Sequence, residues 1–554
     1  MIQETWRTER IIREFTEKGY WSEETLWDYL SENAVRLPKK VAVIDPKGSV
    51  TYGELARGAA RLAQRLKTLG LQKGDRVMML LPDWVEVYYL RYALGRIGAI
   101  CCIGSVDWRR REIEHALSLT GPVAVAIPRT FKKFDFLQTV RDISKGIPSL
   151  RHVLVVDEAA PEGCISLSSM IHDPSENDYL ADPSEPFRTS ANDIDKIQFT
   201  AGTTGPAKAV MRFPNNHIAI GKALLERIKI TEEDKILSVA PISGGIGIIM
   251  AVYAPLLSGA TAILHPRFDA GEALRCVEVQ RATIVAAVPA QTIKMLEVPG
   301  LDTLDLSSLR CWVTAGAPLP IKSWKDVYDR FKCPIVTVYG SVDTGLAAIS
   351  GVDDPVEKVM GSAGRIIPRT EVRIVDDDRN PLPMGEEGEV AIRGATVMAG
   401  YFGDPEATKD RIDEDGWGYT GDYGVLDQDG FLRIVGRKKD LIIRGGQNIS
   451  PKELEDLIMT HPSVMEVSVV GIPDAVMGEK ACACVIPREG RSLSFEELVG
   501  YLRSMEIETH KLPERLELMD GFPMSEGKKV QKYRLREMIV EKMKKEAEKE
   551  EKRS

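Results

Sequence analysis

Residues 199–210 read FTAGTTGPAKAV, a run of small and hydroxyl-bearing residues that ends in Lys208 and two apolar residues. Glycine lets the backbone turn its N–H groups toward an anion, threonine hydroxyls add donors, and lysine supplies positive charge. The run does not match the P-loop pattern G-x-x-x-x-G-K-[ST], because Gly205 is followed by Pro206 and Ala207. Taken alone, it is either a phosphate-binding loop or a glycine-rich turn.

Length and composition indicate a globular, enzyme-sized protein. The 554 residues exceed one ordinary domain, and 44% hydrophobic with 28% charged residues is typical of soluble proteins. A formal net charge of -9 argues against a general nucleic-acid binder, because affinity for the phosphate backbone depends on surplus Lys and Arg. We therefore expect small-molecule partners and no nucleic acid, with a homodimer left open.

The chain shows no signal for export or membrane insertion. Its beginning, MIQETWRTERIIREFTEKGYW, lacks the apolar core of a secretory signal, and we find no uncharged apolar run of about 18 residues. The eight cysteines lie mostly in apolar stretches and are expected to be reduced core residues. Cys482 and Cys484 could bind metal, but no paired Cys or His lies nearby. We expect a cytoplasmic protein without a membrane span.

Helix-like and strand-like segments alternate through the N-terminal two-thirds. Residues 51–70, TYGELARGAARLAQRLKTLG, have helical periodicity, and DRVMMLL at 75–81 follows as an apolar strand candidate. The same succession recurs in residues 85–128 and 271–289. This rhythm is typical of parallel α/β units, so we predict a large layered α/β body.

Toward the C-terminus the pattern changes twice. Short strand candidates at about 368–436 predict a small β-rich subdomain, in which Asp429 and Gly430 suit a hairpin turn. A compact α+β pattern follows, and we place the boundary between residues 1–436 and residues 437–554.

The second of these parts contains a clear helix start. Ser450, Pro451 and Glu453 provide a cap, a first-turn proline and a capping-box glutamate.

Five further strings follow FTAGTTGPAKAV in order. They are VTAGAPLP (313–320), VYGSVDTG (338–345), GYTGDYG (418–424), GRKKDLIIRGGQNISPKELED (436–456) and FPMSEGKKVQKYRLRE (522–537). With these six strings the chain resembles, over nearly its whole length, the adenylate-forming superfamily of acyl-CoA synthetases, peptide-synthetase adenylation domains and firefly luciferase. Its early GYWSEETL resembles the aryl-acid and cyclohexanecarboxylate branches. The resemblance implies a large N-terminal domain followed by a small, mobile C-terminal domain.

The resemblance also implies an ATP site. Its residues are Thr200, Ala201, Gly202, Thr203, Thr204, Gly205, Lys208, Gly316, Ala317, Pro318, Tyr339, Gly340, Ser341, Asp343, Asp422 and Arg437. Residues 200–208 would cover the β- and γ-phosphates, and residues 316–318 would lie against the adenine. Tyr339 would stack on the other face of the base, although a tyrosine at a strand end is often a core residue.

Two carboxylates have separate implied roles. Asp343 stands where the family usually has a magnesium-binding glutamate, and Val342 replaces the usual threonine before it, so the shorter carboxylate puts the metal position in doubt. Asp422 would accept hydrogen bonds from the ribose hydroxyls. Arg437 would hold the ribose or phosphate region, with a solvated hairpin-end arginine as the alternative.

The small domain would supply the remaining residues. Lys529 matches the lysine that promotes adenylation, although Lys528 occupies the family's usual glycine position and leaves a one-residue ambiguity. Lys439 would be the hinge, or else a surface charge. Gly445 and Gly446 would line the tunnel for the pantetheine arm of CoA.

The implied reaction has two steps and uses ATP, Mg²⁺ and coenzyme A. The acid carboxylate attacks the α-phosphorus and expels pyrophosphate, and a thiol then displaces AMP from the acyl-adenylate. A positive charge from Lys529 would lower the barrier between two anions. No protein nucleophile is required, in agreement with the absence of a G-x-S-x-G motif in the sequence.

The acyl pocket would involve residues 240–248, APISGGIGI. Its candidate residues are Gly244, Gly245, Gly247, Ala315 and Ser341. The glycines either leave room for a bulky acid or permit a tight backbone. Since neither 240–248 nor 313–318 contains Lys or Arg, we expect an apolar monocarboxylic acid. A cyclic acid is preferred, and a medium-chain fatty acid is the alternative.

Other acceptors and classes remain open. CoA is the expected acceptor because the chain ends shortly after the small domain, but a separate carrier protein could serve. A nucleotide-binding homologue without catalysis is a further alternative, since Ala201, Ala209, Val342 and Asp343 replace the Ser, Gly, Thr and Glu that are more usual.

Overall fold

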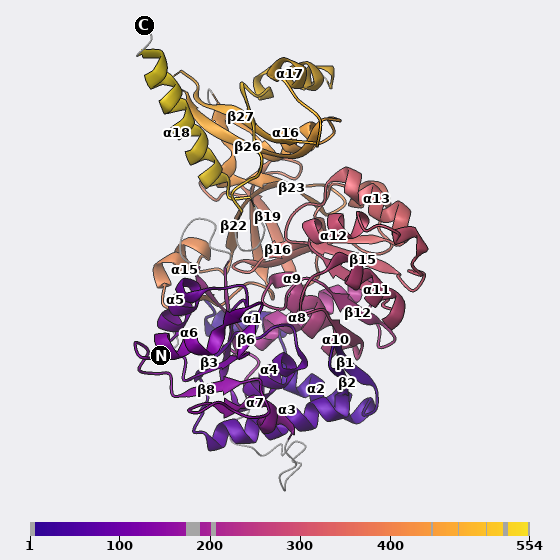
Figure 1. The fold of residues 1–554 in the computed structure, drawn as a ribbon, viewed down its shortest axis with the longest axis vertical. Helices are drawn as coiled ribbons and strands as arrows, with labels where there is room; N and C mark the ends of the chain where they lie inside the picture. The colour runs from indigo at the N-terminus through magenta and orange to yellow at the C-terminus, as the bar shows by residue number, and fades with distance from the viewer. Residues whose placement is uncertain are drawn as a thin grey trace.

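The computed structural model describes residues 6–172, 189–200, 207–444, 447–474, 476–505, 507–524 and 530–551. Figure 1 shows a large α/β body with a smaller C-terminal part, coloured orange to yellow, at one end. Two large sheets form the body and a third forms the smaller part. The expected fold class is therefore confirmed.

An eight-stranded sheet carries the strands on either side of the FTAGTTGPAKAV loop. In spatial order it contains β21 (Gly400–Tyr401), β11 (Ala209–Arg212), β10 (Lys196–Phe199), β4 (Ile100–Ile103), β3 (Arg76–Met79), β5 (Ala124–Ile127), β8 (His152–Val155) and β9 (Ile165–Ser166). The strands from β10 to β9 run parallel, whereas β11 is antiparallel to both β10 and β21. The central strands β4 (ICCI) and β5 (AVAI) are fully buried and continuously apolar, as expected of parallel strands covered on both faces.

A thirteen-stranded sheet is parallel from β16 to β1 and antiparallel on both sides of this run, from β19 to β16 and between β1 and β2. Its order is β19 (Thr370–Val375), β20 (Gly388–Gly394), β22 (Gly418–Leu426), β23 (Phe431–Arg437), β18 (Gly364–Ile366), β17 (Gly345–Ile349), β16 (Ile335–Ser341), β15 (Cys311–Ala315), β14 (Ile284–Ala287), β12 (Lys235–Ser238), β13 (Thr261–Leu264), β1 (Val41–Asp45) and β2 (Gly48–Thr51). The short β18 pairs with β17 on one side and β23 on the other. The expected β-rich segment is thus hydrogen-bonded to the α/β body.

Helices cover both sheets. The large body contains α1 (Glu9–Glu17), α2 (Leu26–Arg36), α3 (Tyr52–Thr68), α4 (Val85–Ile97), α5 (Arg110–Thr120), α6 (Phe136–Ser144), α7 (Leu167–His172), α8 (Pro214–Ile228), α9 (Gly245–Ile248), the π-helical η1 (Ile249–Tyr253), α10 (Ala254–Ser258), α11 (Ala270–Gln280), α12 (Pro289–Leu296), α13 (Ile321–Phe331), α14 (Val356–Val359) and α15 (Pro405–Arg411), with the short β6 (Thr130–Phe131), β7 (Phe134–Asp135) and η2 (Leu301–Thr303). The predicted helix and strand succession from α3 to β5 is confirmed.

Alternating side chains of the strands build separate cores. In β4, Cys101 and Ile103 join a core that also includes α3, α4 and residues of β1 and β13. Ile100 and Cys102 face the opposite core, which includes residues of α5 and α6. This two-residue period explains why the AICCIG segment has no polar face.

The C-terminal part is a separate small sheet with helices. It contains η3 (Lys438–Asp440), β24 (Ile442–Arg444), β25 (Gln447–Ile449), α16 (Pro451–Ile458), β26 (Val464–Asp474), β27 (Gly478–Pro487), α17 (Phe495–Ser504), η4 (Thr509–Lys511), β28 (Arg515–Leu518) and α18 (Lys532–Glu551). The Ser450 hydroxyl caps α16 by accepting from the Glu453 N–H at 3.3 Å. The expected capping-box role of the Glu453 carboxylate is wrong, because that group instead accepts from Lys511 Nζ at 3.0 Å.

The C-x-C pair lies in β27 with both side chains buried. The sulfur atoms of Cys482 and Cys484 are 4.0 Å apart and pack against Leu535 and Ile539 of α18. They therefore contribute to a core, as expected of a strand with this spacing.

Within the described ranges, none of the helices has the length and apolar character needed to cross a bilayer.

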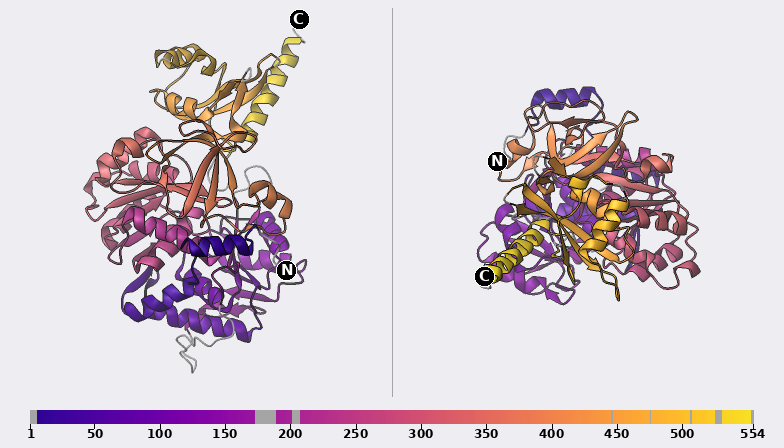
Figure 2. Two further views of the ribbon diagram at one scale, coloured as in Figure 1. Left: turned by 180° about the vertical axis from the view of Figure 1, so that it is seen from behind. Right: turned by 90° about the horizontal axis from the view of Figure 1, so that it is seen from above.

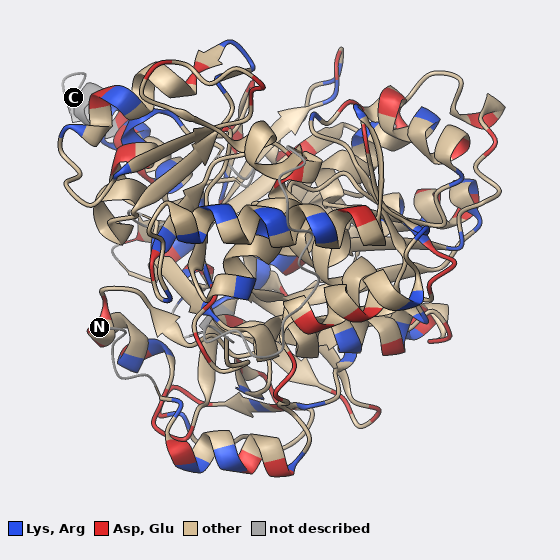
Figure 3. Ribbon diagram, turned by 90° about the horizontal axis from the view of Figure 1, so that it is seen from below, with Lys and Arg blue, Asp and Glu red and all other residues tan. Residues whose placement is uncertain are grey.

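The N-terminal segment ties distant parts of the body together. Figure 2 shows α1 lying across the body when it is seen from behind. Trp6 Nε1 donates to the carbonyl of Met398 at 2.7 Å, and the Trp21 ring packs edge-on against Phe213. On the side seen in Figure 3, basic and acidic residues are both spread over the outer helices.

A buried ionic cluster fixes β10 between two helices. The Asp195 carboxylate accepts from Arg91 of α4 at 2.5 Å and lies 3.0 Å from His217 Nε2 of α8. All three side chains are at most 3% exposed. Burial alone would raise the pKa of Asp195, but the Arg91 charge and the His217 contact lower it to about 2. The carboxylate is therefore ionised and fixed in place.

We predict that Asp195→Ala destabilises the protein by about 3 to 5 kcal/mol, because it leaves the buried Arg91 charge without its partner. Urea unfolding measures this loss. Asp415→Ala is the matched control, since Asp415 pairs with Arg10 at 70% and 63% exposure and should cost less than about 1 kcal/mol. Equal midpoints for the two variants would contradict the prediction.

Candidate functional site

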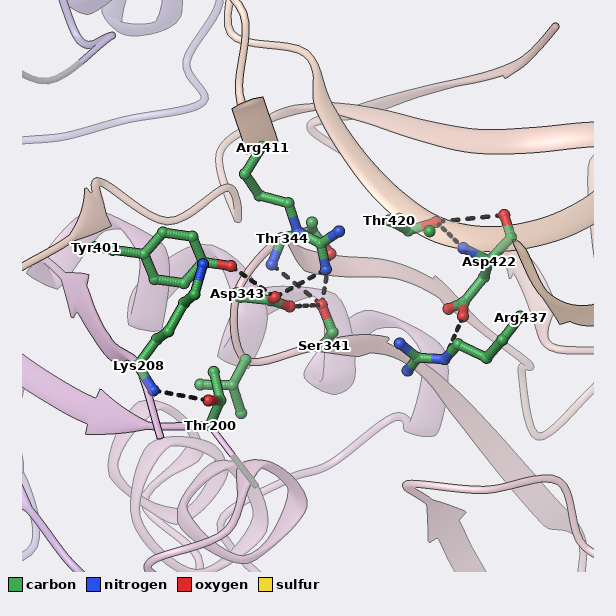
Figure 4. A network of polar contacts seen from close by, with 12 residues as sticks. Thr200, Lys208, Ser341, Asp343, Thr344, Tyr401, Arg411, Thr420, Asp422 and Arg437 are labelled. Atoms are coloured by element: carbon green, nitrogen blue, oxygen red, sulfur yellow. Dashed lines mark hydrogen bonds and ion pairs between the residues drawn. The ribbon is translucent and has the colours of Figure 1, made fainter. Parts of the chain in front are cut away.

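The predicted ATP-site residues converge from several chain segments. Figure 4 shows Lys208, Ser341, Asp343, Asp422 and Arg437 within one polar network. Lys208 precedes β11, Ser341 ends β16, Asp422 lies in β22 and Arg437 ends β23. The fold therefore brings together predicted site residues that are more than 200 positions apart in the sequence.

The base of the FTAGTTGPAKAV loop is closed by hydrogen bonds. Lys208 N donates to Thr200 Oγ1 at 3.0 Å, and Thr200 N donates to the Lys208 carbonyl at 3.0 Å. The Lys208 ammonium lies 4.7 Å from the Tyr401 ring centroid and 3.9 Å from Asp404 Oδ2. The interior of the loop, Ala201, Gly202, Thr203, Thr204 and Gly205, lies outside the described residues.

Asp343 is held by three donors. Ser341 Oγ donates to Oδ1 at 2.7 Å, and Tyr401 Oη and Arg411 Nη2 each donate to Oδ2 at 2.8 Å. Burial would raise the pKa of Asp343, but the Arg411 charge and these hydrogen bonds bring the pKa below its usual value. Asp343 is therefore an ionised carboxylate with a resident counter-ion.

One carboxylate of the site, Asp343, has the chemistry to bind magnesium. Mg²⁺ in nucleotide sites is commonly held by one or two carboxylates together with substrate phosphates and water. Asp343 offers one carboxylate, and its Oδ1 atom accepts from Ser341 while a second lone pair remains. Across the described segments, no group of three or more His, Cys, Asp or Glu side chains is arranged to hold a metal ion.

Asp422 forms the second carboxylate centre. Tyr339 Oη donates to Asp422 Oδ2 at 2.7 Å, and Arg437 Nε donates to Oδ1 at 2.7 Å. Burial raises the pKa of Asp422, and the positive charge of Arg437 opposes this shift. Arg437 is thus paired with the carboxylate, and the Tyr339 hydroxyl is part of the polar network.

The predicted adenine segment lies directly after a buried strand. Ala315 ends β15 as a buried residue, whereas Gly316, Ala317 and Pro318 are exposed. Gly316 has a φ of 86°, which favours glycine. An exposed backbone next to a buried strand end can accommodate a planar base.

The glycines of the predicted acyl segment have different surroundings. A Cβ atom on Gly247 would lie 1.9 Å from the Pro241 carbonyl oxygen, so a close backbone approach requires this glycine. On Gly244 the same distance would be 3.2 Å. Among the residues that the structure describes, a Cβ on Gly245 would meet only Val342 Cγ2 within 4 Å, at 3.7 Å. The two interpretations of the glycines therefore apply to different positions: tight backbone at Gly247 and free space at Gly245.

Two side chains outside the motifs hold the acyl segment. Gln198 Nε2 donates to the Ser243 carbonyl at 2.9 Å, and Asp83 Oδ1 accepts from Ile242 N at 3.1 Å. Burial raises the pKa of Asp83 to about 7. After the segment, α9 continues into the π-helical η1, an irregularity that is frequent at functional sites.

Sequence reasoning missed Arg411, Tyr401 and Arg212. Arg212 donates to the carbonyls of Val342 and Thr396, each at 2.8 Å, and so fixes the segment that carries Asp343. Arg411 lies among the charged residues KDRIDED, where a solvated helix end is the ordinary interpretation. The one available signal was Asp343 itself, which stands in the family's usual glutamate position. A shorter carboxylate needs different side chains around it.

The hinge region follows β23 directly. Lys438 Nζ pairs with Asp377 at 2.9 Å and with Glu389 at 3.1 Å, and burial lowers the pKa of Lys439. Ser450 Oγ donates to the Val435 carbonyl at 2.6 Å and so links the cap of α16 to β23. The catalytic candidate Lys529, its neighbour Lys528 and the tunnel candidates Gly445 and Gly446 lie outside the described residues.

Known proteins resemble the chain over nearly its whole length. The profile of the AMP-binding enzyme family matches residues 30–402, and that of the AMP-binding enzyme C-terminal domain matches residues 453–529. The medium-chain fatty-acid–CoA ligase of Escherichia coli (strain K12) is 33% identical over 532 residues, which cover 96% of this chain and 93% of that protein. The human mitochondrial medium-chain acyl-CoA ligase ACSF2 is 31% identical, with 94% and 88% covered.

Solved structures share the fold. ATP-bound MatB from Rhodopseudomonas palustris has a TM-score of 0.83 at 27% identity, and 93% of this chain and 99% of that chain are covered. The anthranilate CoA ligase AuaEII in complex with anthranoyl-AMP has a TM-score of 0.84 at 24% identity, with 93% and 97% covered.

We predict that Asp422→Asn weakens AMP binding about tenfold, because the neutral amide is a weaker acceptor for hydroxyl donors. Calorimetric titration with AMP and with 2′-deoxy-AMP measures the effect. If Asp422 binds the ribose, the wild-type preference for AMP over its deoxy analogue shrinks in the variant. Asp429→Asn, at an exposed position in the turn of the same hairpin, is the control. An unchanged preference in Asp422→Asn would contradict the ribose role.

Proposed function

The chain belongs to the AMP-binding enzyme family as an AMP-forming acyl-CoA ligase, and we propose that its acid substrate is an apolar, medium-chain monocarboxylic acid. The observation that carries the proposal is the uncharged acyl segment next to the Asp343 network. It comes within contact distance of the network at Gly245, where a Cβ would lie 3.7 Å from Val342. An apolar acyl group placed there has its carboxylate beside the phosphate-binding residues.

Two relatives favour an open-chain acid. The Escherichia coli and human proteins are both named as medium-chain ligases and resemble this chain over more than nine-tenths of its length. A cyclic acid, the substrate preferred from sequence, is the second candidate, and the space at Gly245 favours it because a ring is wider than an alkyl chain.

In the first half-reaction, the acid carboxylate would attack the α-phosphorus of ATP. A P–O bond forms to the acid, the P–O bond to pyrophosphate breaks, and acyl-adenylate results. We propose that Lys208 binds the departing phosphates, that Asp422 and Arg437 orient the ribose, and that Lys529 neutralises charge at the α-phosphate. When bound, Mg²⁺ would neutralise phosphate charge, and Asp343 is the residue that would hold it.

In the second half-reaction, the CoA thiol would attack the acyl carbon and AMP would leave. We propose that the small domain turns about Lys439 between the two steps, so that the Gly445 and Gly446 face replaces Lys529. Lys438 is suited to be the fixed side of this hinge, since it is paired with two carboxylates of the large domain.

We expect the purified protein with ATP, magnesium and CoA to release AMP fastest with octanoate, more slowly with benzoate or cyclohexanecarboxylate, and slowest with acetate. Coupled AMP detection gives kcat/KM for each acid. Gly245→Leu should reduce kcat/KM for octanoate about tenfold or more relative to acetate, because the new side chain fills the space beside Val342.

The matched control is Gly500→Leu, at an exposed position of α17 where an added Cβ would meet no atom within 4 Å. Fastest turnover with a cyclic acid would favour the second candidate. Activity that requires a carrier protein in place of free CoA would overturn the proposed acceptor, and absence of acid-dependent AMP release with every acid would overturn the ligase assignment.

We predict that Lys529→Ala abolishes acid-dependent exchange of pyrophosphate into ATP but spares thioester formation from supplied acyl-adenylate. The reason is that a positive charge is needed where two anions meet, which happens only in the first step. Lys528→Ala is the matched control and should retain exchange. The reverse result would assign the role to Lys528 and contradict our alignment.

A further inference from the structure

Arg411 lies at the centre of the polar network and belongs to none of the six motifs. It is the last residue of α15, and its Nη2 atom donates to Asp343 Oδ2 at 2.8 Å. The side chain is 22% exposed, so it is mostly withdrawn from solvent but still reachable. Figure 4 shows it beside Asp343, with Asp422 and Arg437 to one side.

The guanidinium retains an unused donor. Among the residues that the structure describes, the buried Nε atom of Arg411 has no hydrogen-bond partner. A Cβ built on Gly421 would lie 3.6 Å from Arg411 Nη1, so the group also reaches the turn that precedes Asp422. An arginine presents five donors in one plane, and a single carboxylate oxygen uses few of them. The group can therefore serve a second anion.

Arg411 is linked to Lys208, the residue that we propose binds the departing phosphates. Tyr401 donates to the same Asp343 oxygen as Arg411, and its ring is 4.7 Å from the Lys208 ammonium. Lys208 and Arg411 are therefore joined through one tyrosine and one aspartate. One extended anion can therefore contact both cations, the Lys208 ammonium and the Arg411 guanidinium.

We propose that Arg411 is a polyphosphate-binding residue, which is paired with Asp343 in the nucleotide-free protein and exchanges this carboxylate for the β- and γ-phosphates of ATP. The inference rests on the proposed function, because it takes ATP as the ligand. Arginine suits the exchange, since its planar donors match both carboxylate and phosphate. With magnesium present, the exchange would leave neither partner uncompensated, because the released Asp343 is the residue that would hold the cation.

The test compares nucleotide binding by Arg411→Gln and the wild type. Isothermal titration is run with ATP, pyrophosphate and AMP, once in EDTA and once with magnesium. We expect Arg411→Gln to bind ATP and pyrophosphate about tenfold more weakly and AMP within twofold of the wild type, since AMP lacks the β- and γ-phosphates. Lys409→Gln, an equal charge change at an exposed position of α15, should bind all three as the wild type does.

Asp343→Asn provides a second, independent measurement. In EDTA it should bind ATP more tightly than the wild type, because the carboxylate no longer competes with phosphate for Arg411. This gain should vanish in the double variant with Arg411→Gln. Arg411→Lys, which keeps the charge but not the planar donors, should lie between the wild type and Arg411→Gln.

Several results would overturn the inference. ATP affinity that is unchanged in Arg411→Gln would do so, as would an equal loss for ATP and AMP, which a merely structural role produces. If the wild type binds ATP with magnesium but no variant alters the affinity, the proposed function stands and the role of Arg411 falls. If the wild type binds no nucleotide under either condition, the proposed function falls and this inference with it.

Discussion

The buried carboxylate of Asp195 connects the strand before the phosphate loop to two helices that belong to different parts of the body. It joins α4, which is packed in the core between the sheets, to α8, which follows the loop strand β11. A charged group in such a place is costly unless it is fully paired, so the three side chains have one favourable arrangement. That arrangement fixes the start of β10, directly after Asp195, and β10 leads into Thr200.

Charge compensation also governs the polar network around Asp343 and Asp422. Asp343 is paired with Arg411, and Asp422 is paired with Arg437, so each buried carboxylate has its own guanidinium. In the nucleotide-free protein, the site is thereby stable without an external cation. The exchange proposed at Arg411 would make triphosphate binding a reorganisation of an existing ion pair, which limits the net gain in binding free energy.

The sequence predicted the fold class and the meeting of the motifs, but not the side chains between them. Periodicity identified α3 to β5 because strands buried on both faces and amphipathic helices leave local signals. The pairing of β18 with β17 and β23, which joins the β-rich segment to the body, depends on contacts between distant segments and left no such signal. Arg411 and Tyr401 were missed for the same reason, since each resembles an ordinary surface or strand residue until Asp343 is placed beside it. The expected capping-box glutamate failed because Lys511, remote in sequence, competes for its carboxylate.

The two neighbouring glycines of the acyl segment have different evolutionary prospects. Gly247 faces the Pro241 carbonyl so closely that any side chain would displace the backbone, whereas Gly245 faces open space that ends at Val342. If Gly245 lines the acyl pocket as we propose, single substitutions at this position can change the accepted acid while the segment keeps its path. The rigid glycine preserves the scaffold, and the free glycine, two residues before it, is where new substrate preferences can arise by small steps.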